Sequence, residues 1–141
     1  MCNGALLLIA VYAIGAEARD IEILGGYDTV NPYSDPKYYE MAMFALREQP
    51  QSVDGTYVTV LRLTDVQVQQ VSGTNYKVAF ETALTDCVNS YIPNECWRVN
   101  KQPQQGCTAV IFEDLEAENW ELTSLECYRI AGNDESYIDR Y

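Results

Sequence analysis

Hydrophobic residues recur with the spacing of an amphipathic helix between Asp35 and Pro50. Asp35 can cap the helix N-terminus, Pro36 fits the first helical position, and Pro50 ends the segment. The apolar positions follow the i, i+3, i+4, i+7 rule, with neighbours that widen the same face: Tyr38, Tyr39, Met41, Ala42, Met43, Ala45 and Leu46. A narrow polar stripe remains, formed by Lys37, Glu40 and Arg47. The pattern predicts one largely buried helix of about three turns.

After this helix the pattern changes to the alternation of β-strands. Residues 55–71, "GTYVTVLRLTDVQVQQV", are rich in Val, Thr and Leu, and their apolar phase shifts near residues 63–66, which predicts a bulge. Residues 75–84 alternate well and place on one face Tyr76, Val78, Phe80, Thr82 and Leu84. A second strand pair, "TAVIFEDL" and "WELTSLECY", flanks the turn "EAEN", and an irregular polar loop at residues 89–106 separates the two hairpins. These elements predict an α+β fold, with one helix packed across a twisted antiparallel sheet of four or five strands.

The two ends of the chain differ from this central domain. Residues 1–18 contain the apolar run "GALLLIAVYAIG" followed by "AEA", which is typical of a signal peptide cleaved after Ala18. A buried N-terminal strand or helix is the alternative. Cleavage would leave one domain at residues 19–141, with an exposed extended arm, "RDIEILGGYDTVNPYS", and an acidic tail after about residue 129. The protein is therefore expected to be secreted, and no later segment is apolar enough to cross a membrane.

The number of cysteines indicates how this small domain is stabilised. Beyond the predicted signal peptide the cysteines number four: Cys87, Cys96, Cys107 and Cys127. An even number in a small secreted domain indicates a disulfide framework, and three pairings are possible. Zinc binding is the competing interpretation, but the chain has no histidine and no C-x-x-C pair. We therefore expect two disulfides and no metal.

Several function classes are excluded by residues that the chain lacks. A formal net charge of -12 disfavours nucleic-acid binding, which needs a basic face. Without histidine there is no Ser–His or Cys–His nucleophile pair, and no glycine-rich phosphate loop is present. Carboxylates such as Glu113, Asp114 and Glu116 fall where solvated turns are expected. We predict that the protein is not an enzyme and binds no cofactor.

One stretch of this acidic chain contains no charged residue. Residues 66–76, "VQVQQVSGTNY", contain valines, amides, small hydroxyls and Gly73, which permits a tight turn. A glycine-bearing arm, "EILGGY", precedes the helix, and Trp120 lies at the second hairpin. Each feature also has a plain interpretation: Gly25-Gly26 as a linker, the neutral tip as an ordinary turn, and Trp120 as a core residue.

Taken in order along the chain, these features resemble the secreted, two-disulfide (type 2) cystatins, from about Ile23 to Tyr128. "GGY" with "CTAVIFEDL" is further similar to the salivary and gut cystatins of ticks. The resemblance matches the family's Q-x-V-x-G motif to Gln69, Val71 and Gly73 within "QQVSG", and the family's trunk glycine to Gly25. It also matches Trp120 to the tryptophan of the Pro-Trp pair, although Asn119 replaces the proline.

The resemblance implies a reversible, tight-binding inhibitor of papain-like cysteine proteases. The targets would be cathepsins L and S, with cathepsins C and B as further candidates. It also implies the pairings Cys87–Cys96 and Cys107–Cys127. The residues expected to bind the protease are Ile23, Leu24, Gly25, Gly26, Gln69, Gln70, Val71, Ser72, Gly73, Asn119 and Trp120. Legumain inhibition is not expected, because Val53 stands where the family's legumain-binding Asn would be. A monomer is expected, and the alternative function is an immunomodulatory cystatin-fold binding protein that does not inhibit proteases.

Overall fold

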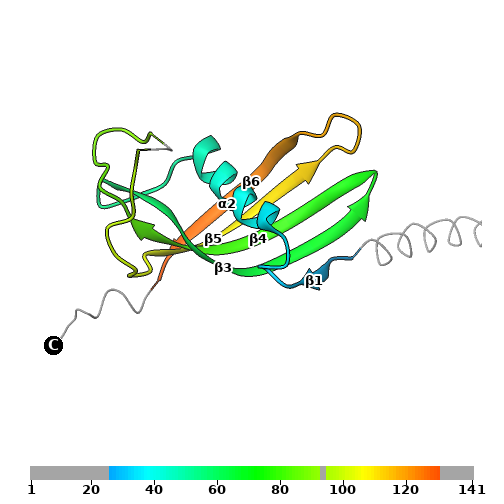
Figure 1. Cartoon of the computed structure of the whole chain (residues 1–141), viewed down its shortest axis with the longest axis horizontal. Coiled ribbons are helices and arrows are strands. Elements are labelled where there is room, and N and C mark those ends of the chain that lie inside the picture. Colours follow the sequence, from blue (N-terminus) through cyan, green and yellow to red (C-terminus); the bar gives the residue numbers. More distant parts are fainter. Residues whose placement is uncertain (1–25, 93–94, 131–141) are drawn as a thin grey trace, which may run out of the picture.

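The computed structural model describes residues 26–92 and 95–130 as one helix packed on an antiparallel sheet (Figure 1). The elements are β1 Asp28–Val30, α2 Pro36–Glu48, β2 Ser52–Val53, β3 Thr56–Val71, β4 Gly73–Leu84, β5 Gln105–Glu113 and β6 Trp120–Arg129. The strands lie in the order β1-β3-β4-β5-β6, and the short β2 pairs with one end of β3. The predicted α+β class is confirmed, with the short strands β1 and β2 added to the four expected from the two hairpins.

Helix α2 forms where the sequence predicted it. The Asp35 carboxylate accepts a hydrogen bond from the backbone N–H of Lys37 at 3.0 Å, which satisfies one of the free N–H groups at the helix start. The fully buried face consists of Met41, Ala42, Ala45 and Leu46. The prediction that Tyr39 widens this buried face is wrong, because 40% of the Tyr39 surface is exposed to solvent. Phe44, which the periodicity did not single out, packs against the core instead.

The core lies between α2 and one face of the sheet. On β4 the predicted alternation holds for Tyr76, Val78, Phe80 and Thr82, and then breaks, since Ala83 is buried and Leu84 is half-buried. Register shifts on β3 between Val60/Arg62 and Leu63/Asp65 confirm the predicted irregularity. Burial of each large apolar side chain contributes roughly 1.5–3 kcal/mol.

Two disulfides stabilise the end of the sheet at which the loop between β4 and β5 lies. Cys87–Cys96 closes part of this loop, and Cys107–Cys127 joins the paired strands β5 and β6, with Cα–Cα distances of 5.6 and 4.1 Å. The pairing implied by the family resemblance is therefore confirmed. Each bridge restricts the unfolded chain, which typically contributes about 2–4 kcal/mol.

Three predictions concern residues outside the described part of the chain. These are the signal peptide at residues 1–18, the arm residues Ile23, Leu24 and Gly25, and the acidic tail beyond Ile130. Among the residues that are described, the sole helix is too short and too polar to cross a bilayer.

Candidate functional site

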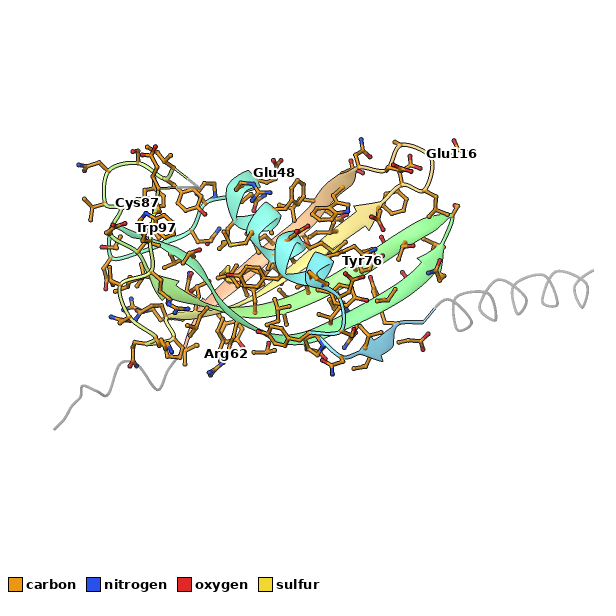
Figure 2. All side chains as sticks on the ribbon, viewed as in Figure 1. Glu48, Arg62, Tyr76, Cys87, Trp97 and Glu116 are labelled. Atoms are coloured by element: carbon orange, nitrogen blue, oxygen red, sulfur yellow. A yellow bond between two sulfur atoms is a disulfide. The ribbon has the colours of Figure 1, made fainter. Side chains whose placement is uncertain are left out.

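Three segments that are far apart in the sequence meet at one end of the sheet (Figure 1). The antiparallel pairing Asp28↔Val68 directs the start of β1 toward the β3–β4 turn. The pairing Thr74↔Glu113 brings the β5–β6 turn to the same end. We call this end the hairpin edge: Gly26, residues 69–73 and residues 114–119. In Figure 2, Glu116 marks the hairpin edge, and Cys87 and Trp97 mark the opposite end.

The first tip of the hairpin edge is narrow and uncharged. Val71 pairs with Gly73, so Ser72 alone lies between the strands. Gln70 and Ser72 are exposed, and Val71 keeps 48% of its surface in solvent. Gln69 is half-buried, and its Oε1 accepts a hydrogen bond from Asn75 Nδ2 at 2.9 Å. The tip thus offers amides, a hydroxyl and one apolar side chain on a backbone fixed by strand pairing.

Gly73 is required at this tip for two independent reasons. Its φ of +126° lies in a region that L side chains rarely adopt. A Cβ at this position would also lie 2.5 Å from Phe112 Cζ and 2.9 Å from the backbone oxygen of Glu113. The first tip can therefore pack this tightly against β5 only with glycine at position 73.

The second tip spans residues 114–119 and has a different character. The Asp114 side chain accepts from the Glu116 N–H at 3.0 Å, and the Asp114 carbonyl accepts from the Glu118 N–H at 2.8 Å. Leu115 projects from this turn with 68% of its surface exposed, and Asn119 is exposed beside it. Sequence reasoning missed Leu115, although one apolar residue within "EDLEAE" was the available signal. One shallow recess joins the two tips, and it is lined by Val71, Ser72, Gly73, Asp114, Leu115 and Glu116.

Trp120 lies at the base of the second hairpin rather than at its tip. Its indole is half-buried and packs edge-on against Phe44 of α2, with ring centroids 5.6 Å apart. Its Nε1 donates a hydrogen bond to Glu113 Oε2 at 3.0 Å. These contacts agree with the interpretation of Trp120 as a core residue, and its role as an interface aromatic stays a prediction.

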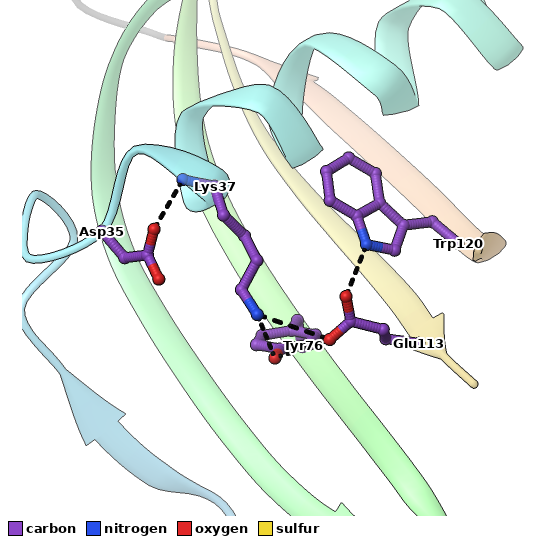
Figure 3. A network of polar contacts seen from close by, with 5 residues as sticks. All are labelled: Asp35, Lys37, Tyr76, Glu113 and Trp120. Atoms are coloured by element: carbon purple, nitrogen blue, oxygen red, sulfur yellow. Dashed lines mark hydrogen bonds and ion pairs between the residues drawn. The ribbon is translucent and has the colours of Figure 1, made fainter. Parts of the chain in front are cut away.

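Glu113 is the centre of a polar network that links four elements (Figure 3). Besides Trp120, its carboxylate accepts a hydrogen bond from the Tyr76 hydroxyl at 3.0 Å and has Lys37 Nζ at 3.4 Å. Lys37 Nζ also donates to the Tyr76 hydroxyl oxygen at 3.0 Å. Sequence analysis assigned Glu113 to a solvated turn, because nothing local indicates that Lys37 and Tyr76 approach it.

The network shifts the pKa of each titrating member. Burial, the largest single influence, acts to raise the pKa of Glu113, but hydrogen bonds from Trp120 and Tyr76 and the charge of Lys37 together hold it below its usual range. Hydrogen bonding to Tyr76 raises the pKa of Lys37 despite partial burial. Burial is the main cause of the raised pKa of Tyr76. Glu113 and Lys37 are therefore both charged at neutral pH.

The root of the N-terminal arm is also held in place. Residues 28–30 pair with residues 66–68, and Lys77 Nζ lies 4.4 Å from the centroid of the Tyr27 ring. Gly26, the first described residue, is exposed at the hairpin edge. The described root of the arm, residues 26–30, therefore lies at a fixed position beside the first tip.

Comparison with known proteins identifies the class to which this fold and edge belong. The cystatin domain model matches residues 25–116. Salivary cystatin-L2 of Ixodes scapularis is 29% identical over 89% of this chain and 97% of its own length, and cystatin-2 of Ornithodoros moubata is 32% identical over 87% and 94%. The crystal structure of mialostatin, a gut cystatin from the hard tick Ixodes ricinus, has 28% identity and a TM-score of 0.63 over 74% of this chain and 99% of that one.

The chain therefore belongs to the cystatin family, and its relatives include cystatins from both hard and soft ticks. Cystatins are inhibitors of cysteine proteases, so the family assignment confirms that the protein is not an enzyme.

Proposed function

We propose that the protein is a secreted, reversible, tight-binding inhibitor of papain-like cysteine proteases, of the cathepsin L type. In this proposal residues 1–18 are removed as a signal peptide. The N-terminal arm and the two hairpin tips then enter the active-site cleft together. The main support is that an uncharged first tip, a second tip and the root of the arm lie at one end of one rigid sheet.

The chemistry of the first tip suits insertion into a narrow cleft. An unpaired charge that lost its water there would be strongly unfavourable, and residues 66–76 carry none. Gln69 and Gln70 supply amide hydrogen-bonding groups, and the half-exposed Val71 supplies apolar contact. Because the tip is a closed strand pair rather than an extended substrate, it blocks the cleft without presenting a bond for cleavage.

The second tip and the arm add contacts on either side of this wedge. Ile23 and Leu24 would fill apolar subsites, each contributing up to about 1.5–3 kcal/mol if fully buried. Gly25 and Gly26 would let the arm bend away before the catalytic cysteine. At the second tip we assign the apolar contact to Leu115, which is more exposed than the half-buried Trp120. Asn119 lies at the rim, and Trp120 supports the turn from behind.

Legumain is not proposed as a target. Val53, where the family's legumain-binding Asn would be, is only 6% exposed in β2 and offers an apolar side chain. Because Val53 replaces this Asn, that side of the molecule lacks the side-chain amide by which legumain would be recognised.

One observation favours the alternative, an immunomodulatory cystatin-fold protein that does not inhibit proteases. The tryptophan expected at the interface contacts Phe44 and Glu113 instead, so the second hairpin lacks an aromatic anchor at its tip. Activity that is retained by a Gly73→Glu variant in an immune-cell assay would support this alternative.

The decisive experiment is a titration of residues 19–141 against cathepsins L, S, C and B. We expect reversible inhibition of cathepsins L and S in the stoichiometric, tight-binding regime. Gly73→Glu should weaken inhibition at least about a hundredfold, since it adds a charge and a clash at the tip. No inhibition of any of the four enzymes at micromolar concentration would contradict the proposal, and inhibition unaffected by Gly73→Glu would contradict the wedge assignment.

A further inference from the structure

We propose that Glu113 is a positioning residue, which holds the two hairpin tips in the single relative arrangement that protease inhibition requires. This inference rests on the proposed function. Glu113 is the last residue of β5, and the second tip begins at the next residue. Its side chain is 21% exposed and lies behind the hairpin edge, so it would act through the tips rather than by touching the protease.

The backbone of Glu113 contacts the first tip directly. The carbonyl oxygen of Glu113 lies where a Cβ on Gly73 would clash with it. Glu113 also pairs in the sheet with Thr74, the residue that follows Gly73 in β4. Glu113 also pairs with Trp120 across the second hairpin, which closes the turn at residues 114–119. A displacement of Glu113 would therefore move the base of both tips at once.

The side chain of Glu113 fixes this backbone position from three directions. Trp120 holds it from β6, Tyr76 from β4, and Lys37 from the first turn of α2 (Figure 3). The three partners are donors, and an ionised carboxylate with two oxygens can accept from all of them. A glutamine of the same shape would turn an NH₂ group toward at least one donor and would leave the Lys37 ammonium without its counter-charge.

The groups that face Glu113 keep the network in one charge state from neutral pH down to the range in which free carboxyls begin to protonate. Lys37 and Tyr76 are the titratable partners from α2 and β4, Trp120 from β6 does not titrate, and Asp114 follows in the chain. Because the pKa of Glu113 is lowered and that of Lys37 is raised, both remain charged when the pH falls to values at which free carboxyls begin to protonate. The two tips are thus expected to keep the same relative position under mildly acidic conditions.

The test compares Glu113→Gln with Glu126→Gln, an equal loss of charge at an exposed position farther along β6. Inhibition constants against cathepsin L are measured with folded protein well below its unfolding temperature. We expect Glu113→Gln to weaken inhibition about tenfold, as for the loss of a hydrogen bond to a charged group, and Glu126→Gln to change it less than about twofold. Lys37→Met, which leaves two donors on Glu113, should weaken inhibition in the same direction by a smaller factor and serves if Glu113→Gln fails to fold.

A second readout does not depend on inhibition. In a Trp97→Phe background Trp120 is the single tryptophan, since the chain contains two. Its emission should titrate with a midpoint below the usual carboxyl range, and this titration should vanish in Glu113→Gln. Amide exchange at Glu118, whose N–H is bonded to the Asp114 carbonyl, should accelerate in the same variant.

These readouts separate the two proposals. If the wild-type protein inhibits no protease, the proposed function fails, and the fluorescence and exchange data still decide whether Glu113 locks the tips. If the wild type inhibits and Glu113→Gln inhibits equally well, the positioning role is overturned. Unchanged exchange at Glu118 together with an unshifted Trp120 titration would overturn it as well.

Discussion

At the scale of single residues, two glycines in the described part of the chain adopt backbone conformations that side chains disfavour, but only one of them is packed against neighbouring residues. At Gly73, with a φ of +126°, a side chain would meet Phe112 and Glu113, whereas at Gly55, with a φ of +86°, a Cβ would have no neighbour within 4 Å. The pair separates backbone strain from steric contact, because the same Gly→Ala change tests strain alone at one site and strain with overlap at the other.

We predict that Gly73→Ala destabilises the protein more than Gly55→Ala does. The left-handed backbone strain should cost roughly 1–2 kcal/mol at each position, and overlap with Phe112 and Glu113 should add about 1–3 kcal/mol at Gly73 alone. Chemical denaturation gives both free energies of unfolding. Only Gly73→Ala should also weaken inhibition, and equal losses of stability in the two variants would show that the tip relaxes without strain.

Single residues also show where sequence reasoning succeeds and where it stops. Asp35 and Pro36 act on neighbouring backbone, so the helix start could be predicted from local chemistry. The environment of Trp120 could not be predicted in this way, because Trp120 packs against Phe44, which lies 76 residues earlier in the sequence. Glu113 was misassigned to solvent for the same reason: Lys37 and Tyr76 reach it only after the sheet and helix have packed.

At the scale of elements, β-alternation predicted the two hairpins because each strand has one buried face. The short β1 was expected only as an extended arm, since three residues are too few to show a period. Its pairing with residues 66–68 of β3 is a tertiary event. The elements of the proposed inhibitory edge are thus the ones whose arrangement depends on long-range contacts, including the network that ties α2 and β4 to the second hairpin.

This network predicts how stability should depend on acidity. The folded-state pKa of Glu113 lies below the reference value of 4.5, so the contribution of its carboxylate is fully present above that pH. That contribution is lost as the pH falls through the lowered pKa. The difference in unfolding free energy between wild type and Glu113→Gln should therefore be constant from pH 7 to about pH 5 and should shrink below that.

Urea denaturation at a series of pH values measures this difference. Glu126→Gln controls for the general effect of removing one negative charge from a chain with a net charge of -12. A difference that grows as the pH falls would mean that the carboxylate is destabilised by burial rather than stabilised by its donors.

At the scale of the whole molecule, the two ends of the sheet carry different features. The hairpin edge carries the two tips and the root of the arm, and the opposite end carries the Cys87–Cys96 loop and the 70% exposed Trp97 (Figure 2). Strand β6 runs from one end to the other, so Arg129 lies far from the tips. Changes at the disulfide end should therefore leave inhibition intact.

The strongest whole-molecule prediction compares the two termini. Deleting residues 19–25 should weaken inhibition by a factor that differs between proteases, because apolar subsites differ in how well they accept Ile23 and Leu24. Deleting residues 131–141 should leave the inhibition constants within about twofold, because that tail follows the end of β6, at the opposite end of the sheet.

The effect of deleting the arm should be smaller in a Tyr27→Ala variant, since Tyr27 and Lys77 help to fix the point from which the arm leaves. Inhibition constants against cathepsins L, S and B for four variants would decide this: the two deletions, Tyr27→Ala, and Tyr27→Ala with residues 19–25 deleted. Equal losses from both deletions would refute the division of the molecule into an inhibitory and a structural end.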